Sequence, residues 1–239
     1  MKLKKITTLT TISLLLLLFL GCQNNEKINL NPQTILNDAT SRINDWQSFR
    51  FRLEHEKGTT TISNGMELRV VEGEVVVEGE VVLPRRVKLT GKATVGGQFI
   101  ELDIVLIDEL SFMTNPLTGK WNQIDPEDSP FGNFDVREVI ANILKMMKNP
   151  DFLSSPLKEE DLKIKGEVIA TVFEPLVGLA DPNMNAEVHL ELDFANMNVK
   201  SAKIIGRINP LDPQEVIRII KIWEVDGNIE VNPPIEPLK

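Results

Sequence analysis

The sequence predicts an α+β fold in which one long antiparallel sheet packs two helices against its apolar face. Apolar residues recur with a spacing near 3.6 in two segments and with a spacing of two in most of the remaining chain, the patterns of amphipathic helices and half-buried strands. The chain has 239 residues, and its only long apolar run lies at the N-terminus. Without that run, its length suits one large domain. We therefore expect a single domain over residues 31–239.

The N-terminus has the features of an export signal. Three lysines within the first five residues precede an apolar run over residues 12–20, and Gly21 stands directly before Cys22, the only cysteine. A cysteine at this place is typical of bacterial lipoproteins, in which the thiol is diacylated and becomes the new N-terminus. Phe19 stands where such signals prefer an aliphatic residue, and a plain signal peptide or an uncleaved anchor are the alternatives. We expect residues 1–21 to be the signal, Cys22 the lipid attachment site and residues 22–30 a polar tether.

Charge and composition narrow the classes of function. The formal net charge is −9, which disfavours binding to nucleic acid and to anionic headgroups. We therefore expect that the protein has no nucleic-acid partner. We also expect that it binds the outer face of the cell membrane through its acyl anchor alone. A single cysteine allows no internal disulfide, so an apolar core must stabilise the domain.

Two segments have helical spacing. The first follows Asn31-Pro32, a capping residue and a proline at a tolerated first position, and its apolar residues are Ile35, Leu36, Ala39, Ile43 and Trp46. The second opens with Asp135 and Glu138 at the capping-box spacing and ends before Asn149-Pro150. Its apolar residues are Val136, Val139, Ile140, Ile143, Leu144 and Met147.

Strands are predicted where apolar and polar residues alternate. The series begins at Ser48, continues over residues 75–83, 87–95, 100–106 and 110–114, and resumes near 164–173, 186–194, 201–208 and 216–225. Gly96-Gly97 indicates a hairpin turn, residues 115–119 with Trp121, Pro126 and Pro130 indicate a loop, and residues 158–163 form a charged linker. Residues 175–182 form an apolar loop or short helix. These roughly nine strands suit an antiparallel sheet with one apolar and one solvated face.

No arrangement of residues indicates catalysis. His55 and His189 are the only histidines, neither has metal-ligand spacing, and we place both on the solvated face of their strands. The sequence has no serine in a G-x-S-x-G turn, and residues 58–61 lack the lysine of a phosphate loop. We therefore expect that the protein is not an enzyme and that it has neither a metal site nor a cofactor.

The remaining feature that could serve a function is the apolar face of the predicted sheet. A long sheet twists and curls, so two helices laid on its apolar face can leave a gap that side chains do not fill. The alternative is that the helices pack down and form an ordinary core. The residue pattern leaves both arrangements open.

Several strings spread over residues 35–234 carry a resemblance to a known family. They are the cysteine of the signal, the helix end at residues 46–49, the strand pair at 100–112, the turn at 115–121, the helix after Phe134-Asp135, and residues 221–223 with 231–234. In these the chain resembles the LppX/LprA/LprF/LprG family of actinobacterial cell-envelope lipoproteins. The resemblance implies a strongly curved antiparallel half-barrel, similar to the LolA-like periplasmic carriers, with helices covering its concave face.

The same resemblance implies a hydrophobic cavity for acyl chains between the sheet and the helices, with the loop at residues 173–179 near its mouth. It implies a lining of Phe49, Phe51, Leu53, Val87, Leu89, Leu102, Ile104, Leu106, Ile140, Leu144 and Met147. The sequence thus predicts a membrane-anchored carrier of a lipid or glycolipid, with an envelope transporter as candidate partner. A structural envelope lipoprotein without ligand, and a chaperone or receptor for acylated lipoproteins, are the alternatives.

Overall fold

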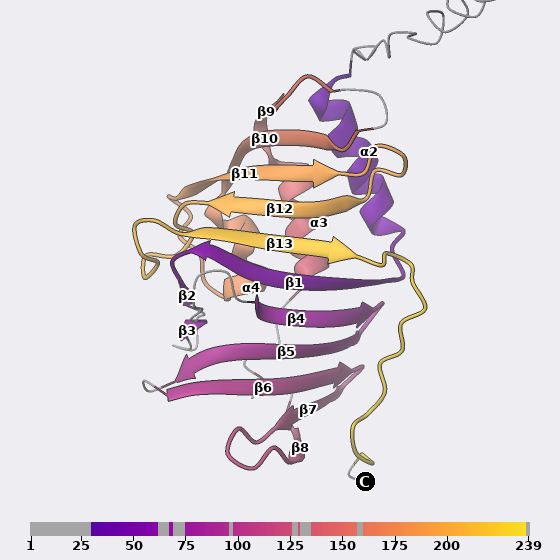
Figure 1. Cartoon of the computed structure of the whole chain (residues 1–239), viewed down its shortest axis with the longest axis vertical. Coiled ribbons are helices and arrows are strands. Elements are labelled where there is room, and N and C mark those ends of the chain that lie inside the picture. Colours follow the sequence, from indigo (N-terminus) through magenta and orange to yellow (C-terminus); the bar gives the residue numbers. More distant parts are fainter. Residues whose placement is uncertain are drawn as a thin grey trace, which may run out of the picture.

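The computed structural model describes residues 30–61, 67–68, 75–95, 98–125, 129, 135–156 and 160–237. Within these residues thirteen strands form one antiparallel sheet, and three α-helices and a short 3-10 helix accompany it (Figure 1). The helices are α2 (Pro32–Asn44), α3 (Val136–Met146) and α4 (Glu174–Val177), and the 3-10 helix is η3 (Ala170–Phe173). Among the described residues, none of the helices combines the length and the apolar character needed to cross a bilayer.

The first half of the chain supplies one side of the sheet. Its strands are β1 (Ser48–Lys57), β2 (Thr60–Thr61), β3 (Glu67–Leu68), β4 (Val75–Val82), β5 (Arg86–Val95), β6 (Gln98–Ile107), β7 (Leu110–Thr114) and β8 (Trp121–Ile124). The second half supplies β9 (Lys148–Phe152), β10 (Leu162–Ile169), β11 (Asn185–Leu192), β12 (Val199–Ile205) and β13 (Ile217–Trp223).

The two halves meet where β1 pairs with β13. The strand order is β8-β7-β6-β5-β4-β1-β13-β12-β11-β10-β9, an open path with β8 and β9 at its edges, and β2 and β3 pair beside it. Phe51 lies opposite Ile222 of β13 on one side and Gly79 of β4 on the other. The α+β class and the antiparallel sheet predicted from the sequence are confirmed.

Both predicted helix starts are confirmed. The Asn31 Oδ1 atom accepts a hydrogen bond from the Gln33 backbone N–H at 2.8 Å, and Pro32 opens α2. The Asp135 Oδ1 atom accepts one from the Glu138 backbone N–H at 2.8 Å at the start of α3. Such side-chain acceptors satisfy donors that a helix leaves unpaired at its first turn. The predicted apolar positions of both helices are buried.

Alternation along the strands separates two faces, as expected. In β1, Phe49, Phe51 and Leu53 are buried on the face toward α2 and α3, called the helix-side face below. The intervening side chains form ion pairs on the other face: Arg50 with Glu80 at 3.0 Å, and Glu54 with Arg52 at 2.7 Å. The core therefore lies on the helix side.

Three sequence expectations about element boundaries are wrong. Trp121 begins β8 instead of lying in a loop. Helix α3 ends at Met146, before Asn149-Pro150, as expected, although these two residues lie inside β9, a strand that the sequence did not predict. Residues 170–173 form η3 instead of extending a strand, and the charged linker ends where β10 begins at Leu162. The strand count of nine is too low by four, because the sequence did not predict β2, β3, β8 and β9. The strands β2 and β3 have two residues each, and β8 and β9 are short edge strands held by backbone pairing to one neighbour, without clear alternation. A proline is tolerated in such an edge strand. Gly96-Gly97, Pro126 and Pro130 lie outside the described residues.

The C-terminal segment covers a smaller apolar cluster on the opposite face. After β13 the chain runs down beside β1 and β4 to β6 (Figure 1). Val231 of this segment is buried with Val105, Ile107 and Phe112, the outward-facing apolar residues of β6 and β7. This part of the outer face is therefore shielded from solvent.

Candidate functional site

One apolar cluster joins the helices to the helix-side face of the sheet. It contains every residue that the resemblance implies as cavity lining: Val87 and Leu106 are half-buried at its margin, and the other nine are buried. The cluster draws on both halves of the chain, from α2 and α3 as well as from β1, β4 to β6 and β10 to β13. The structure thus brings these residues into one continuous apolar region, while their contact with a ligand stays a prediction.

Over β10 to β13 the helix-side face is sealed. Ile164, Val188, Ile204 and Ile220, one from each strand, have no exposed surface. Figure 1 shows α2 and α3 behind this part of the sheet. Packing here is close, with little room for a ligand.

Gly166 marks how closely α3 approaches β10. A Cβ atom at Gly166 would lie 2.5 Å from the Met147 Cγ atom and 2.8 Å from its sulfur, much closer than van der Waals contact. The Met147 side chain therefore lies directly on the β10 backbone. Met147 belongs to the sealed part of the face.

Over β5 to β7 the helix-side face keeps accessible apolar surface. Register places Val87 and Leu89 of β5, Ile104 and Leu106 of β6, and Met113 of β7 on this face. Val87, Leu106 and Met113 are half-buried, and so is Ile100, which lies on the same face of β6 as Ile104 and Leu106. None of the described helices lies behind β5 to β8 in Figure 1. We call this region the β5–β7 apolar face, formed by Val87, Leu89, Ile100, Leu102, Ile104, Leu106 and Met113.

Aromatic side chains stand at the border between the two parts. The ring centroids of Trp46 and Phe49 are 5.2 Å apart, and those of Phe49 and Phe51 are 6.3 Å apart. Gly79 leaves room for this row, because a Cβ atom there would lie 2.6 Å from the Phe51 Cε1 atom. The Phe51 ring thus lies across β4, between the sealed part and the β5–β7 apolar face.

The structure also contains a buried polar network that the sequence reasoning missed. His55 is 1% exposed on the helix-side face, so its assignment to the solvated face is wrong. Its Nε2 atom lies 2.6 Å from the Thr60 Oγ1 atom, which accepts a hydrogen bond from the Arg218 Nε–H at 2.5 Å. Arg218 also forms an ion pair with Asp212 at 2.7 Å, and both side chains are fully buried.

Position along the strand would have revealed this burial. His55 continues the buried series Phe49, Phe51 and Leu53, and Arg218 has the same parity in β13 as Ile220. Burial, and secondarily the Arg218 charge, lower the pKa of His55 to about 4, while the Asp212 charge opposes the shift. The imidazole is therefore neutral at pH 7, and the network anchors residues 206–216 to the sheet. His189 is half-buried beside Glu187 on the outer face, as predicted.

A pocket of about 470 Å³ opens on the outer face and differs in character from the predicted apolar site. Charged side chains of β4 and β5 and the Trp223 ring contribute to its lining, and Arg50 there is bound to Glu80. Among the described residues, no group of His, Cys, Asp and Glu side chains could hold a metal ion.

Comparison with known proteins identifies the fold. No family model matches the chain, and no curated protein matches it in sequence. Among solved structures, LprF from Mycobacterium bovis superposes with a TM-score of 0.61 at 13% sequence identity, covering 86% of this chain and 97% of LprF. The Mycobacterium tuberculosis lipoprotein LppX superposes with a TM-score of 0.54 at 9% identity, covering 84% of this chain and 97% of LppX. The chain has the LprF and LppX fold.

That fold is the one expected from the sequence resemblance. A LolA superfamily protein from Nitrosomonas europaea matches with a TM-score of 0.26, so the relation to the periplasmic carriers stays a prediction.

Proposed function

We propose that this protein is a membrane-anchored, non-enzymatic carrier that holds the acyl chains of a lipid or glycolipid on the β5–β7 apolar face. The observation that carries the proposal is the accessible aliphatic surface of Val87, Ile100, Leu106 and Met113 beside a sealed core. An ordinary core would cover these side chains as completely as Ile164 and Val188 are covered. In this proposal the acyl chains lie in a cavity on the helix-side face of the curved sheet. They cover the apolar side chains of the β5–β7 apolar face that the protein leaves accessible.

The chemistry of the face suits acyl chains. Its residues are aliphatic apart from the Met113 thioether, and a thioether adapts to irregular apolar shapes. Each methylene removed from water contributes about 0.8 kcal/mol, so a multi-chain lipid needs no polar contact to be held. The proposed lining centres on Val87, Leu89, Leu102, Ile104 and Leu106. Ligand contact by Phe49, Phe51, Leu53, Ile140, Leu144 and Met147, which pack in or beside the sealed part, stays a prediction.

The anchor in this proposal is Cys22, acylated after removal of residues 1–21. A nine-residue tether over residues 22–30 spans at most about 30 Å. The domain would therefore remain next to the outer face of the membrane that donates or receives the lipid. An envelope transporter would be the partner that loads or unloads it.

Two tryptophan substitutions test the proposal. Leu106→Trp adds bulk where the side chain is half-buried, and Leu190→Trp adds the same bulk in the sealed part, where the leucine is 1% exposed. Native mass spectrometry of the exported protein should show bound lipid in the wild type. Lipid occupancy should fall in Leu106→Trp at a nearly unchanged melting temperature, because the new ring fills accessible space.

Leu190→Trp is the matched control. Overpacking in a filled core typically costs 1–3 kcal/mol, so this variant should lose stability. A wild-type protein free of lipid, or equal loss of stability in both variants, would show that the β5–β7 apolar face is part of an ordinary core.

A further inference from the structure

Exposed apolar side chains gather at one end of the sheet. Within the described residues six large apolar side chains are strongly exposed, and four of them lie in loops or at a strand start at the same end. They are Phe99 (62% exposed), Leu117 (86%), Leu179 (60%) and Leu211 (72%). We call this the apolar end of the sheet.

Antiparallel pairing explains why these residues share an end. Strands β5, β7, β10 and β12 all run toward the end of the sheet at which β1 finishes. The connections over residues 115–120, 170–184 and 206–216 therefore lie at that end, and so does the start of β6. Figure 1 shows β1, β5 and β12 pointing to this end, on the left of the molecule. Phe99 and Leu117 belong to neighbouring hairpins, and Leu179 and Leu211 to two adjoining loops.

Hydrogen bonds from one buried side chain fix the backbone at two of the exposed leucines. The Asn209 side chain is 3% exposed; its Nδ2–H donates to the Leu179 carbonyl oxygen at 3.0 Å, and its Oδ1 atom accepts from the Leu211 backbone N–H at 2.8 Å. Asp212 in turn accepts from the Asn209 backbone N–H at 3.1 Å and pairs with buried Arg218. These buried polar groups fix the backbone of both loops, and the side chains of Leu179 and Leu211 are exposed on them.

Leu117 is held in a similar way. The Asn115 Oδ1 atom accepts hydrogen bonds from the backbone N–H groups of Leu117 at 2.9 Å and Thr118 at 3.1 Å, which fixes a tight turn. Lys120 follows in the same turn and is exposed. A leucine with a nearby lysine suits a bilayer interface, because the amine can reach the headgroups while the leucine enters the acyl region.

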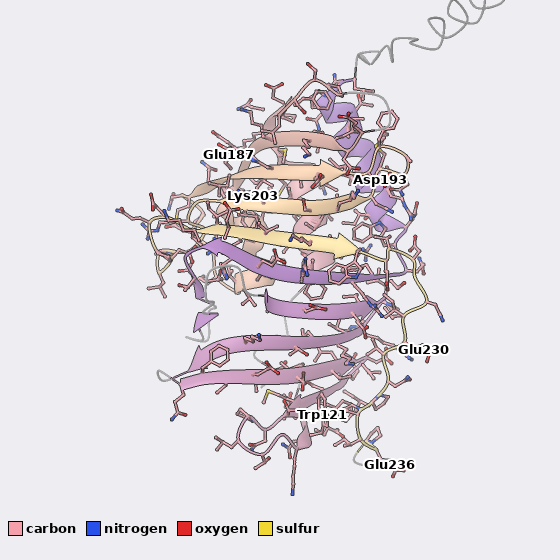
Figure 2. The ribbon with its side chains drawn as sticks, in the orientation of Figure 1. Trp121, Glu187, Asp193, Lys203, Glu230 and Glu236 are labelled. Carbon is pink, nitrogen blue, oxygen red and sulfur yellow. The ribbon has the colours of Figure 1, made fainter. Side chains whose placement is uncertain are left out.

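Charge separates the two ends. The loops at the other end carry mainly acidic residues, and within their described residues Arg85 is the only basic one: the acids are Asp45, Asp108, Glu109, Glu160, Asp161, Asp193, Glu224, Asp226 and Glu230. Figure 2 shows Asp193 and Glu230 at that end, on the right. Ion pairs neutralise some acids at both ends. At the acidic end Arg42 pairs with Asp226, Arg50 with Glu224, Arg85 with Glu109 and Lys200 with Asp161; at the apolar end Lys57 pairs with Glu215 and Arg218 with Asp212. The other five acids named above leave the acidic end with a net negative charge, which anionic headgroups repel.

We infer that the apolar end is a membrane-contact surface, where Phe99, Leu117, Leu179 and Leu211 enter the boundary between headgroups and acyl chains. A fluid bilayer fits this surface because the side chains stand on separate loops spread along the sheet, and they form no single groove for a folded partner or a peptide. The inference requires no ligand cavity, but it rests on the acyl anchor of the proposed function. It concerns how the domain lies on the membrane to which Cys22 would hold it.

The test places a fluorescent reporter at each end of the anchored protein. The full protein, purified with its own N-terminal anchor, is reconstituted into phosphatidylcholine and phosphatidylglycerol vesicles that contain a doxyl-labelled lipid quencher. An NBD group is attached at Leu117→Cys or, as the opposite-end control, at Glu109→Cys, whose native side chain is 82% exposed. Wild-type protein carried through the same labelling reports any free Cys22 thiol. The doxyl lipid should quench the reporter at position 117 and leave the one at position 109 bright.

Charge substitutions complete the test. Leu179→Glu with Leu211→Glu should lower the membrane-docked fraction reported at position 117 by roughly tenfold, because two leucines that would enter the bilayer are lost. Leu153→Glu, at a leucine 42% exposed at the other end, is the matched control and should leave quenching unchanged. All three sites are solvent-exposed, and circular dichroism verifies that the variants stay folded. Equal quenching at both reporters, stronger quenching at position 109, or no effect of the double variant would overturn the inference.

Discussion

Protonation of His55 should destabilise the fold in mildly acid solution. The neutral imidazole shares a hydrogen bond with the Thr60 hydroxyl, whose oxygen also accepts one from the Arg218 Nε–H. A second proton would place a positive charge in a buried site beside the Arg218 guanidinium. Burial and that charge lower the pKa of His55 from 6.5 to about 4.

The sign and size of the effect follow from proton linkage. A histidine with a lowered pKa in the folded state binds its proton more readily when the chain unfolds. Its contribution is therefore complete above pH 6.5 and is lost as the pH falls from 6.5 to 4. At about 1.36 kcal/mol per pKa unit, the loss is about 2 kcal/mol near pH 5 and about 3 kcal/mol near pH 4.

The assay compares urea unfolding of the wild type and His55→Gln near pH 7.5 and near pH 5. The glutamine amide can either accept or donate the hydrogen bond with Thr60, and it does not titrate. The wild type should lose about 2 kcal/mol more than His55→Gln over this interval. His189→Gln, at the half-buried second histidine, is the matched control and should retain the wild-type loss. A wild type and a His55→Gln variant that lose equal stability would refute the reasoning.

Three further predictions concern single side chains. Arg218→Met should reduce the free energy of unfolding by about 3–5 kcal/mol, because it leaves the Asp212 carboxylate buried without its partner; urea titration measures this loss, and a change below 1 kcal/mol would contradict it. Gly79→Ala should cost about 1–3 kcal/mol, because its Cβ atom would meet the Phe51 ring at 2.6 Å; an unchanged melting temperature would show that the ring moves freely. Cys22→Ala should yield an exported protein that leaves the membrane fraction or an unprocessed precursor; membrane retention after verified signal removal would argue against the anchor.

Local chemistry explains why much of the fold could be predicted. The caps at Asn31 and Asp135 act within three residues of the helix they start, so the sequence alone places both helix beginnings. Alternation in β1 likewise assigns Phe49 and Leu53 to one face without knowledge of any partner strand. The implied lining residues that belong to strands fall on the helix-side face for the same reason, while Ile140 and Leu144 lie on the buried side of α3.

Interactions between distant segments decided the rest. The strand β1 pairs with both β4 and β13, which joins residues far apart in the sequence. No local sequence pattern predicts this pairing. The position of His55 in β1 indicates that it is buried, but its partners Thr60 and Arg218 come from β2 and β13 and are known only once these strands lie beside β1. Edge strands β8 and β9 exist because one neighbour pairs with each of them.

The candidate site shows the same division. The sequence determines that Leu106 and Leu190 both point to the helix side, because side-chain direction in a strand depends only on position. Where α2 and α3 dock decides that Leu190 is sealed while Leu106 keeps accessible surface, and docking is a property of the assembled core. The sequence therefore determined which face is apolar, and the tertiary structure decided which part of that face stays open.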